Sequence, residues 1–142
     1  MTHQLYKNEC ASCHMGYQPG LLPERSWQKL MSGLDNHFGD NAELTAESYT
    51  AILNYLTDNA ADKSDYKRSR RITNSLAADD TPLRITDTDY FKRKHRELSL
   101  TAITHNAEIG SFSNCIACHR QADKGSFNEN EIKIPGALGR WD

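Results

Sequence analysis

The chain has 142 residues, 37% of them hydrophobic, with a formal net charge of −2 and a mean hydropathy of −0.74. This length allows one domain or two very small ones, and the weak charge excludes the strong positive field of a nucleic-acid-binding protein. No apolar run is long enough to span a bilayer, and the first ten residues lack the apolar core of a signal peptide. So polar a chain has little apolar surface to bury, which indicates either partial disorder or a core filled by something other than side chains.

The first predicted element is a short helix over residues 5–14, which carries the stretch "CASCH". This stretch places Cys10, Cys13 and His14 within five positions. Residues 15–23 contain glycines and prolines, which interrupt helices and predict a loop. His3, ahead of the helix, is expected to be a mobile terminal residue.

Two longer helices are predicted after the loop. Over residues 24–39, helical spacing places six side chains on one stripe, and Gly39 is the predicted C-terminal stop. The stripe consists of Trp27, Leu30, Met31, Leu34, His37 and Phe38. Over residues 44–61, Thr45 is the predicted N-cap, between the staple residues Leu44 and Tyr49. The buried face of this helix is predicted to hold Tyr49, Ile52, Leu53 and Leu56.

From residue 62 the chain becomes more charged. Residues 62–71 predict an exposed helix or a linker, and Pro82 bars a helix from the turn-rich segment around it. Residues 86–98 predict a helix capped by Thr86 or Thr88. One side of that helix is predicted to hold Phe91, His95 and Leu98.

A second motif, "CIACH", places Cys115, Cys118 and His119 at the spacing of the first, with Ser113 or Asn114 as the predicted cap. The tail, residues 125–142, contains too much Gly, Pro and Asn for a long helix. It predicts one short extended piece at Ile132 and Ile134. Outside the two motifs the halves of the chain do not align, so they are not duplicates.

All four cysteines fall within the two Cys-x-x-Cys-His motifs. This spacing is typical of c-type haem attachment, in which each thiol adds across one vinyl group of the haem and the histidine ligates the iron. Positions i, i+3 and i+4 share one face of a helix, so the three side chains address one porphyrin. The motifs therefore predict two covalently bound haem c groups, which would also fill the core that the side chains do not.

Two other uses of paired cysteines fit less well. Zinc ribbons separate their Cys-x-x-Cys pairs by about 15–20 residues, whereas these pairs lie near opposite ends of the chain, and zinc leaves the histidine after each pair unexplained. A thioredoxin-like dithiol is expected beside a βαβ pattern, and the sequence contains none.

The remaining question is what takes the second axial position of each iron. A histidine or methionine there gives a closed iron suited to electron transfer, whereas an open position binds small ligands. His37, on an apolar stripe, is the preferred candidate for the first haem, with Met31 as the alternative. His95 is preferred for the second haem, with His105, in a less regular stretch, as the alternative. Met15 is too close to His14 to reach the opposite side of the ring.

Several stretches together resemble the bacterial dihaem cytochrome c family known as DHC. They are residues 9–44, "PLRIT" at 82–86, the pair Lys94 and His95, and residues 114–135. The resemblance implies a mostly α fold, with a class I cytochrome c-like domain over 1–61 and a smaller, irregular haem domain over 62–142. It also implies bis-histidine ligation, with ligands at His14, His37, His95 and His119. The class I-like order pairs His14 with His37 and leaves His119 with His95, a crossed pairing being the alternative.

These features predict a monomeric, low-potential electron carrier rather than an enzyme, since a bis-imidazole iron lacks the potential-raising thioether of methionine. Haem attachment of this kind is completed outside the cytoplasm, so the expected location is the periplasm. The resemblance implies an oxygen-binding monohaem cytochrome, called SHP, as a partner, and a membrane cytochrome b as electron donor. The competing hypothesis is a ligand-binding or peroxidase-like protein with one open iron.

Basic residues concentrate in "KRSRR" at 67–71 and "KRKHRE" at 92–97. A solvated helix face is the favoured interpretation. The alternatives are a docking patch for an acidic partner, or guanidinium groups paired with haem propionates.

Overall fold

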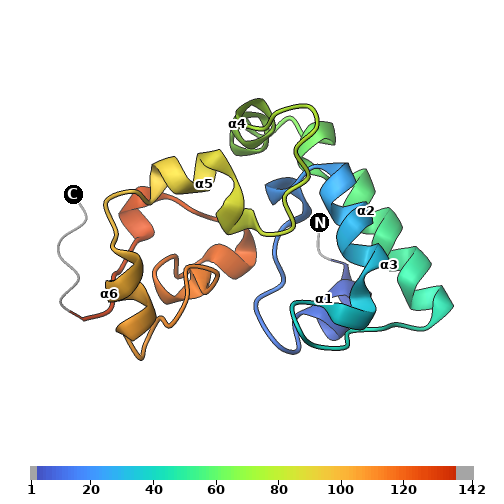
Figure 1. Ribbon diagram of the computed structural model, residues 1–142, viewed down its shortest axis with the longest axis horizontal. Coiled ribbons are helices and arrows are strands. Elements are labelled where there is room, and N and C mark those ends of the chain that lie inside the picture. Colours follow the sequence, from blue (N-terminus) through green and yellow to red (C-terminus); the bar gives the residue numbers. More distant parts are fainter. Residues whose placement is uncertain (1–2, 137–142) are drawn as a thin grey trace.

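The computed structural model describes residues 3–136. Among them are six α-helices and seven short 3-10 turns but no strand, which confirms the predicted mostly α class. Figure 1 shows α1, α2 and α3 on one side of the molecule, α5 and α6 on the other, and α4 between them at the top. No helix of the described part combines the length and apolarity needed to cross a bilayer.

Helix α1 (Gln4–Cys10) is shorter than predicted, because the rest of the first motif forms a turn. The expectation that His3 is mobile is wrong. Its Nδ1 accepts a hydrogen bond from the backbone N–H of Tyr6 at 3.3 Å, which caps the helix. Its ring also lies 4.9 Å from the ring of Tyr55, so the residue is held on two sides.

Helix α2 (Glu24–Ser32) ends seven residues before the predicted stop at Gly39. Gly33 caps it, and a 3-10 turn over Leu34–Asn36 follows, because Gly, Asp and Asn are weak helix formers. Phe38 and Gly39 then take positive φ angles of 53° and 97°. His37 therefore lies on a loop rather than on the predicted helix.

Helix α3 (Ala46–Asp58) confirms the prediction for its N-terminus, since Thr45 Oγ1 accepts a hydrogen bond from the backbone N–H of Ser48 at 3.2 Å. Ile52 and Leu56 are fully buried, as predicted. They belong to the larger of two hydrophobic clusters, here called the first core, which consists of Tyr6, Leu22, Trp27, Met31, Ile52, Leu56 and Ala60.

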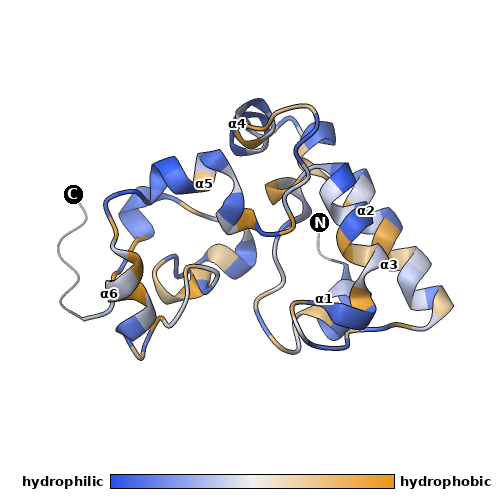
Figure 2. Ribbon diagram, viewed as in Figure 1, coloured by the Kyte–Doolittle hydropathy of each residue, from blue (hydrophilic) through white to orange (hydrophobic). Residues whose placement is uncertain are grey.

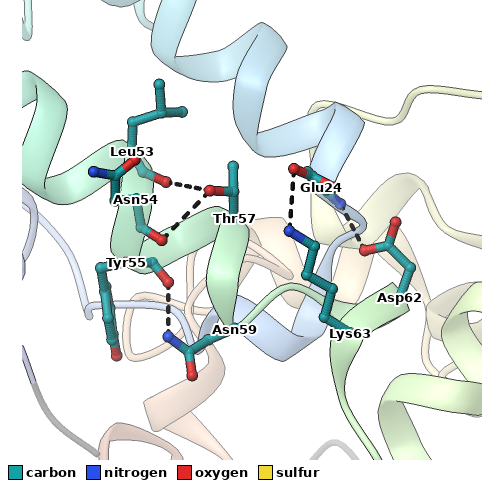
Figure 3. Close-up of polar contacts among 8 residues, drawn as sticks. All are labelled: Glu24, Leu53, Asn54, Tyr55, Thr57, Asn59, Asp62 and Lys63. Atoms are coloured by element: carbon teal, nitrogen blue, oxygen red, sulfur yellow. Dashed lines mark hydrogen bonds and ion pairs between the residues drawn. The ribbon is translucent and has the colours of Figure 1, made fainter.

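Polar contacts turn the chain back onto α2 at the end of α3 (Figure 3). Asn59 donates from Nδ2 to the carbonyl of Tyr55 at 2.8 Å, one turn before the end of the helix. Lys63 forms an ion pair with Glu24 at 3.2 Å, and Asp62 accepts a hydrogen bond from the backbone N–H of Glu24 at 2.9 Å. These contacts fix the start of α2 against the segment that leaves the first half.

Helix α4 (Lys67–Ser75) settles the choice between helix and linker in favour of a helix. Its Ser69 is buried and donates from Oγ to the carbonyl of Gly20 at 2.8 Å. A Cβ at position 20 would lie 2.7 Å from Ser69 Oγ, so this approach requires glycine. Ile72 is also fully buried. Helix α4 therefore packs between the two halves and is not an exposed linker.

The second half contains shorter helices, α5 (Asp89–Lys94) and α6 (Leu100–His105). Thr88, one of the two predicted caps, caps α5 by accepting a hydrogen bond from the backbone N–H of Phe91 at 3.2 Å. The predicted helix over 86–98 is thus a 3-10 turn followed by α5, and His95 lies just past its end. The irregular stretch expected around His105 is in fact helical, because Ser99 caps α6.

The second motif forms a 3-10 turn over Cys115–Ala117. Asn114 occupies the cap position, but its side chain donates to the carbonyl of Ile109 at 3.0 Å instead of capping. The second, smaller core consists of Ile103, Ile109 and Ala117. Ile132 makes an antiparallel bridge with His119, as the predicted extended piece requires, while residues 137–142 of the tail lie outside the described residues.

Candidate haem-binding site

A single cavity of about 960 Å³ runs through the middle of the molecule. Both motifs open onto it, although about a hundred residues separate them in the sequence. The predicted haem-binding residues that line it are Cys10, Cys13, His14, His37, His95, Cys115, Cys118 and His119. The fold therefore brings all eight to one place.

The first site pairs His14 with His37, whose ring centroids lie 6.4 Å apart with an interplanar angle of 33°. Two imidazoles on opposite sides of one metal ion have centroids about 6 Å apart, from metal–nitrogen bonds of about 2 Å and ring radii of about 1 Å. His14 Nδ1 lies 2.6 Å from the carbonyl of Met15. If Nδ1 carries the proton and donates it there, Nε2 is left free for a metal.

The second site pairs His95 with His119, whose ring centroids lie 6.1 Å apart at 74°. His95 Nδ1 lies 2.8 Å from the carbonyl of Phe91, which again leaves Nε2 free. Phe91 stacks on the ring of His95 at 3.9 Å, and Phe127 meets the ring of His119 edge-on at 5.2 Å. Phe112 adds a third ring at 6.1 Å from His95, whereas the first pair has Tyr17 and Phe38 beside it.

The surroundings keep three of these imidazoles neutral, the form that ligates a metal. Burial lowers the pKa of His37, and the neighbouring His14 lowers it further. Burial also lowers the pKa of His95, against the opposing effect of its bond to Phe91. Burial is the main cause of the lowered pKa of His119, and the neighbouring His95 and Arg68 lower that pKa further.

Burial disfavours the thiolate form of two of the cysteines in the chain without haem. Burial raises the pKa of Cys10 and of Cys115 to about 11, with Glu9 adding to the shift for Cys10. Among residues 3–136, no three His, Cys, Asp or Glu side chains form a group that could hold a bare metal ion. The two Cys-x-x-Cys pairs thus do not converge as a zinc ribbon requires, whereas each lies beside one histidine pair.

Of the alternative axial candidates, His3 and His105 lie outside the cavity and Met31 is packed into the first core. His3 caps α1, and His105 is exposed at the end of α6; neither lines the cavity. Met31 does line the cavity, but it is buried in the first core between α2 and α3. Within the part of the chain that the structure describes, the two histidine pairs are therefore the best placed axial ligands.

Two residues of the loop after the first motif contact the segments that flank the second motif, and no sequence pattern predicted these contacts. The hydroxyl of Tyr17 donates to the carbonyl of Ser113 at 2.8 Å, and its ring lies 4.9 Å from the ring of His14. Gln18 donates from Nε2 to the carbonyl of Ala122 at 2.8 Å. Tyr17 and Gln18, called the latch below, bind the two haem loops directly to each other.

Four basic side chains also line the cavity: Arg68, Arg71, Arg84 and Lys94. Arg84 lies over the ring of Phe38 at 4.0 Å, and Arg68 over the ring of Phe127 at 5.0 Å. Guanidinium groups held in this way present several donors to a carboxylate. The cavity thus combines apolar walls with cations suited to a flat, acidic, largely apolar group such as haem.

Comparison with known proteins agrees with this geometry. A family model described as dihaem cytochrome c matches residues 6–127. A diheme cytochrome c structure from Rhodobacter sphaeroides is 45% identical, covers 89% of this chain and 98% of its own, and has a TM-score of 0.78. A diheme cytochrome c structure from Shewanella baltica OS155 is 38% identical, covers 97% and 96%, and has a TM-score of 0.77. Among curated protein sequences, none is significantly similar. The chain belongs to the dihaem cytochrome c family, which implies two covalently bound haem c groups and a role in electron transfer.

Proposed function

We propose that the protein is a periplasmic, low-potential electron carrier in which both irons are held between two histidines. His14 and His37 ligate one iron, and His95 and His119 ligate the other. The observation that carries this proposal is the separation of the ring centroids, 6.4 Å in one pair and 6.1 Å in the other. Cys10 and Cys13 attach the first haem, and Cys115 and Cys118 the second.

The protein supplies imidazole ligands around one shared cavity, and a bound haem iron would supply the one-electron chemistry. The carbonyls of Met15 and Phe91 orient the imidazoles of His14 and His95. Phe91, Phe112 and Phe127 exclude water around the second pair. Nitrogen ligation from both sides favours the ferric state more than methionine ligation does, so we expect two low midpoint potentials.

The competing function, an open iron that binds small ligands, is disfavoured because an imidazole faces each motif histidine across the cavity. The test is low-temperature EPR of the oxidised protein together with CO addition to the reduced protein. We expect two low-spin ferric signals of bis-histidine type and no binding of CO. A high-spin signal, or a rapid CO shift in the unmodified protein, would show that one iron is open.

Variants of the two loop histidines make the test specific for each site. His37→Ala and His95→Ala should each open one iron, so that each variant binds one equivalent of CO. His105→Ala is the matched control, since this histidine is exposed and does not line the cavity. CO binding in the control variant, or none in the His37 and His95 variants, would contradict the ligand assignment.

The division of the chain, its location and its partners belong to the same proposal. The first core ends at Ala60 and the second begins at Ile103, which is compatible with the proposed boundary between residues 61 and 62. Family membership supports an oxygen-binding monohaem cytochrome as acceptor and a membrane cytochrome b as donor. Fractionation of cells that make the native protein tests the location, and recovery of haem-loaded protein from the cytoplasm alone would contradict a periplasmic site.

A further inference from the structure

The basic residues of the chain are concentrated in two short stretches. Residues 67–71 and 92–96 hold eight of the 17 Lys and Arg residues and no Asp or Glu. The rest of the chain holds the other nine and all 19 acidic residues. The eight, called the basic ridge below, are Lys67, Arg68, Arg70, Arg71, Lys92, Arg93, Lys94 and Arg96. Although the net charge is only −2, the basic and acidic residues are distributed very unevenly along the chain.

The fold joins the two stretches into one surface. The first lies on α4 and the second runs from α5 into the turn after it, and these two helices pack against each other. Figure 2 shows both helices as mostly hydrophilic, along the same edge of the molecule. All of the ridge side chains are exposed except Arg68, which is half-buried.

The protein itself leaves most of this charge unbalanced. Within residues 3–136, the only ion pair that uses a ridge cation joins Arg70 to Asp65 at 3.3 Å, and both partners are exposed, so the pair contributes little. Arg68, Arg71 and Lys94 line the cavity, where haem propionates are available to them. The other five do not line it: Lys67, Arg70, Lys92, Arg93 and Arg96. Propionates do not account for this second group.

The ridge borders the second haem site. Helix α5 leads directly into His95, and its residues Tyr90 and Phe91 line the cavity. On α4, Arg68 lies over Phe127, whose ring in turn meets the ring of His119. The α5 part of the ridge therefore lies beside the His95–His119 pair, while α4 also packs against the turns Pro19–Leu21 and Ala61–Lys63 of the first half.

We propose that the basic ridge is the docking surface for an acidic electron-transfer protein that exchanges electrons with the second haem. The proposal rests on the proposed function and adds the class of partner and the point of contact. In the transfer, a ferrous haem iron becomes ferric and the redox centre of the partner gains that one electron, with no bond made or broken. Complementary charge of this kind raises the rate of encounter and fixes the orientation of the partner.

The first experiment measures the sign of the local charge at the site of electron exit. The reduced full-length holoprotein is oxidised by hexacyanoferrate(III), a trianion, and by hexaammineruthenium(III), a trication, at ionic strengths from about 10 to about 200 mM. If electrons leave beside the ridge, the rate of oxidation by the anion falls as salt is added and the rate of oxidation by the cation rises. If the net negative charge governs the encounter, both trends reverse, and the proposal is wrong.

The second experiment locates the effect with charge-matched variants. Lys92→Glu/Arg93→Glu and Lys29→Glu/Lys124→Glu change the formal charge equally, and all four positions are exposed and outside the cavity. Binding of an acidic flavodoxin, measured calorimetrically at low ionic strength, should weaken at least about tenfold in the ridge variant and change little in the control. Equal weakening in both variants, or tighter binding of the wild type to phosphatidylglycerol vesicles than to flavodoxin, overturns the proposal.

A milder pair of substitutions guards against a folding defect, since Glu at the end of α5 opposes the helix dipole. Lys92→Gln/Arg93→Gln should reduce flavodoxin binding in the same direction, against Lys29→Gln/Lys124→Gln as its control. The EPR and CO measurements test the carrier function separately from the docking surface. An open iron with an intact ridge effect rejects the carrier function alone, whereas two closed irons without a ridge effect reject the docking surface alone.

Discussion

In the proposed division of the chain each half holds one haem, but the two halves differ in helix length and in the size of their hydrophobic cores. The first half uses helices of up to 13 residues and a core that includes Trp27, Ile52 and Leu56. Beyond α4, the second half has helices of six residues, several 3-10 turns and a core of three buried residues. With so few buried apolar side chains, we expect the second half to depend on its haem to fill the interior. The first half has a larger core made of its own side chains.

The largest expected effect comes from removing one haem at a time. Cys115→Ser/Cys118→Ser should leave the second half without its attached haem, and proteolysis within residues 89–136 should become at least about tenfold faster. Cys10→Ser/Cys13→Ser should leave α2 and α3 protected, since the first core remains. Limited proteolysis with mass spectrometry measures both, and equal loss of protection in the two halves would remove the contrast between them.

Truncating one isoleucine in each core compares them directly. Ile52→Ala and Ile103→Ala each leave a cavity that costs about 2–5 kcal/mol of unfolding free energy. Ile52 does not line the haem cavity, but Ile103 does. Hydrogen exchange should therefore increase throughout the first half for Ile52→Ala, and mainly around α6 and the second motif for Ile103→Ala. Uniform exchange changes in both variants would mean that the two cores are one cooperative unit.

The helix caps provide a smaller contrast. Thr88 is buried and both accepts from Phe91 and donates to the carbonyl of Ile85, so Thr88→Ala should cost about 1–2 kcal/mol. Thr45 is exposed, and Thr45→Ala should cost about 1 kcal/mol or less. Because α5 positions His95, only Thr88→Ala should also move the EPR signal of one haem. An unchanged EPR spectrum would show that α5 does not set that ligand.

The last contrast, of about the same size as the cap at Thr45, concerns the latch. Tyr17→Phe removes the hydroxyl that bonds to Ser113, and Tyr6→Phe removes one that bonds to the carbonyl of Tyr17 within the first half. Each should cost about 1 kcal/mol. Only Tyr17→Phe should separate the thermal unfolding of the two halves into distinct steps, as followed by calorimetry. A single sharp transition in that variant would show that other contacts join the halves.

The sequence predicted the parts of the molecule that depend on local chemistry. The two motifs, the cap at Thr45 and the choice of Thr88 as one of two caps all follow from short-range rules, and the structure bears out both caps. Helical periodicity identified α3 because 13 residues are enough to establish it. The apolar residues around His37 identified it as a candidate ligand, and its side chain does face His14. The helix predicted to carry His37, however, ends at Ser32.

What could not be predicted is either very short or very distant in sequence. Helix α6 has only six residues, too few for a periodic pattern, and its region reads as irregular. The end of α2 was misplaced because the apolar stripe continues past Gly33 while the backbone does not. The bond from Tyr17 to Ser113 spans 96 positions, and no local pattern reports a contact of that length.

That same bond has a consequence for the order of events during maturation. A chain threaded N-terminus first presents Cys10 and Cys13 long before Ser113 arrives, because 96 positions separate the two ends of the bond from Tyr17. Closing so long a loop is slow compared with forming the helices beside the first motif. We therefore expect the first motif to be able to react with its porphyrin before the bond from Tyr17 to Ser113 joins the two haem loops.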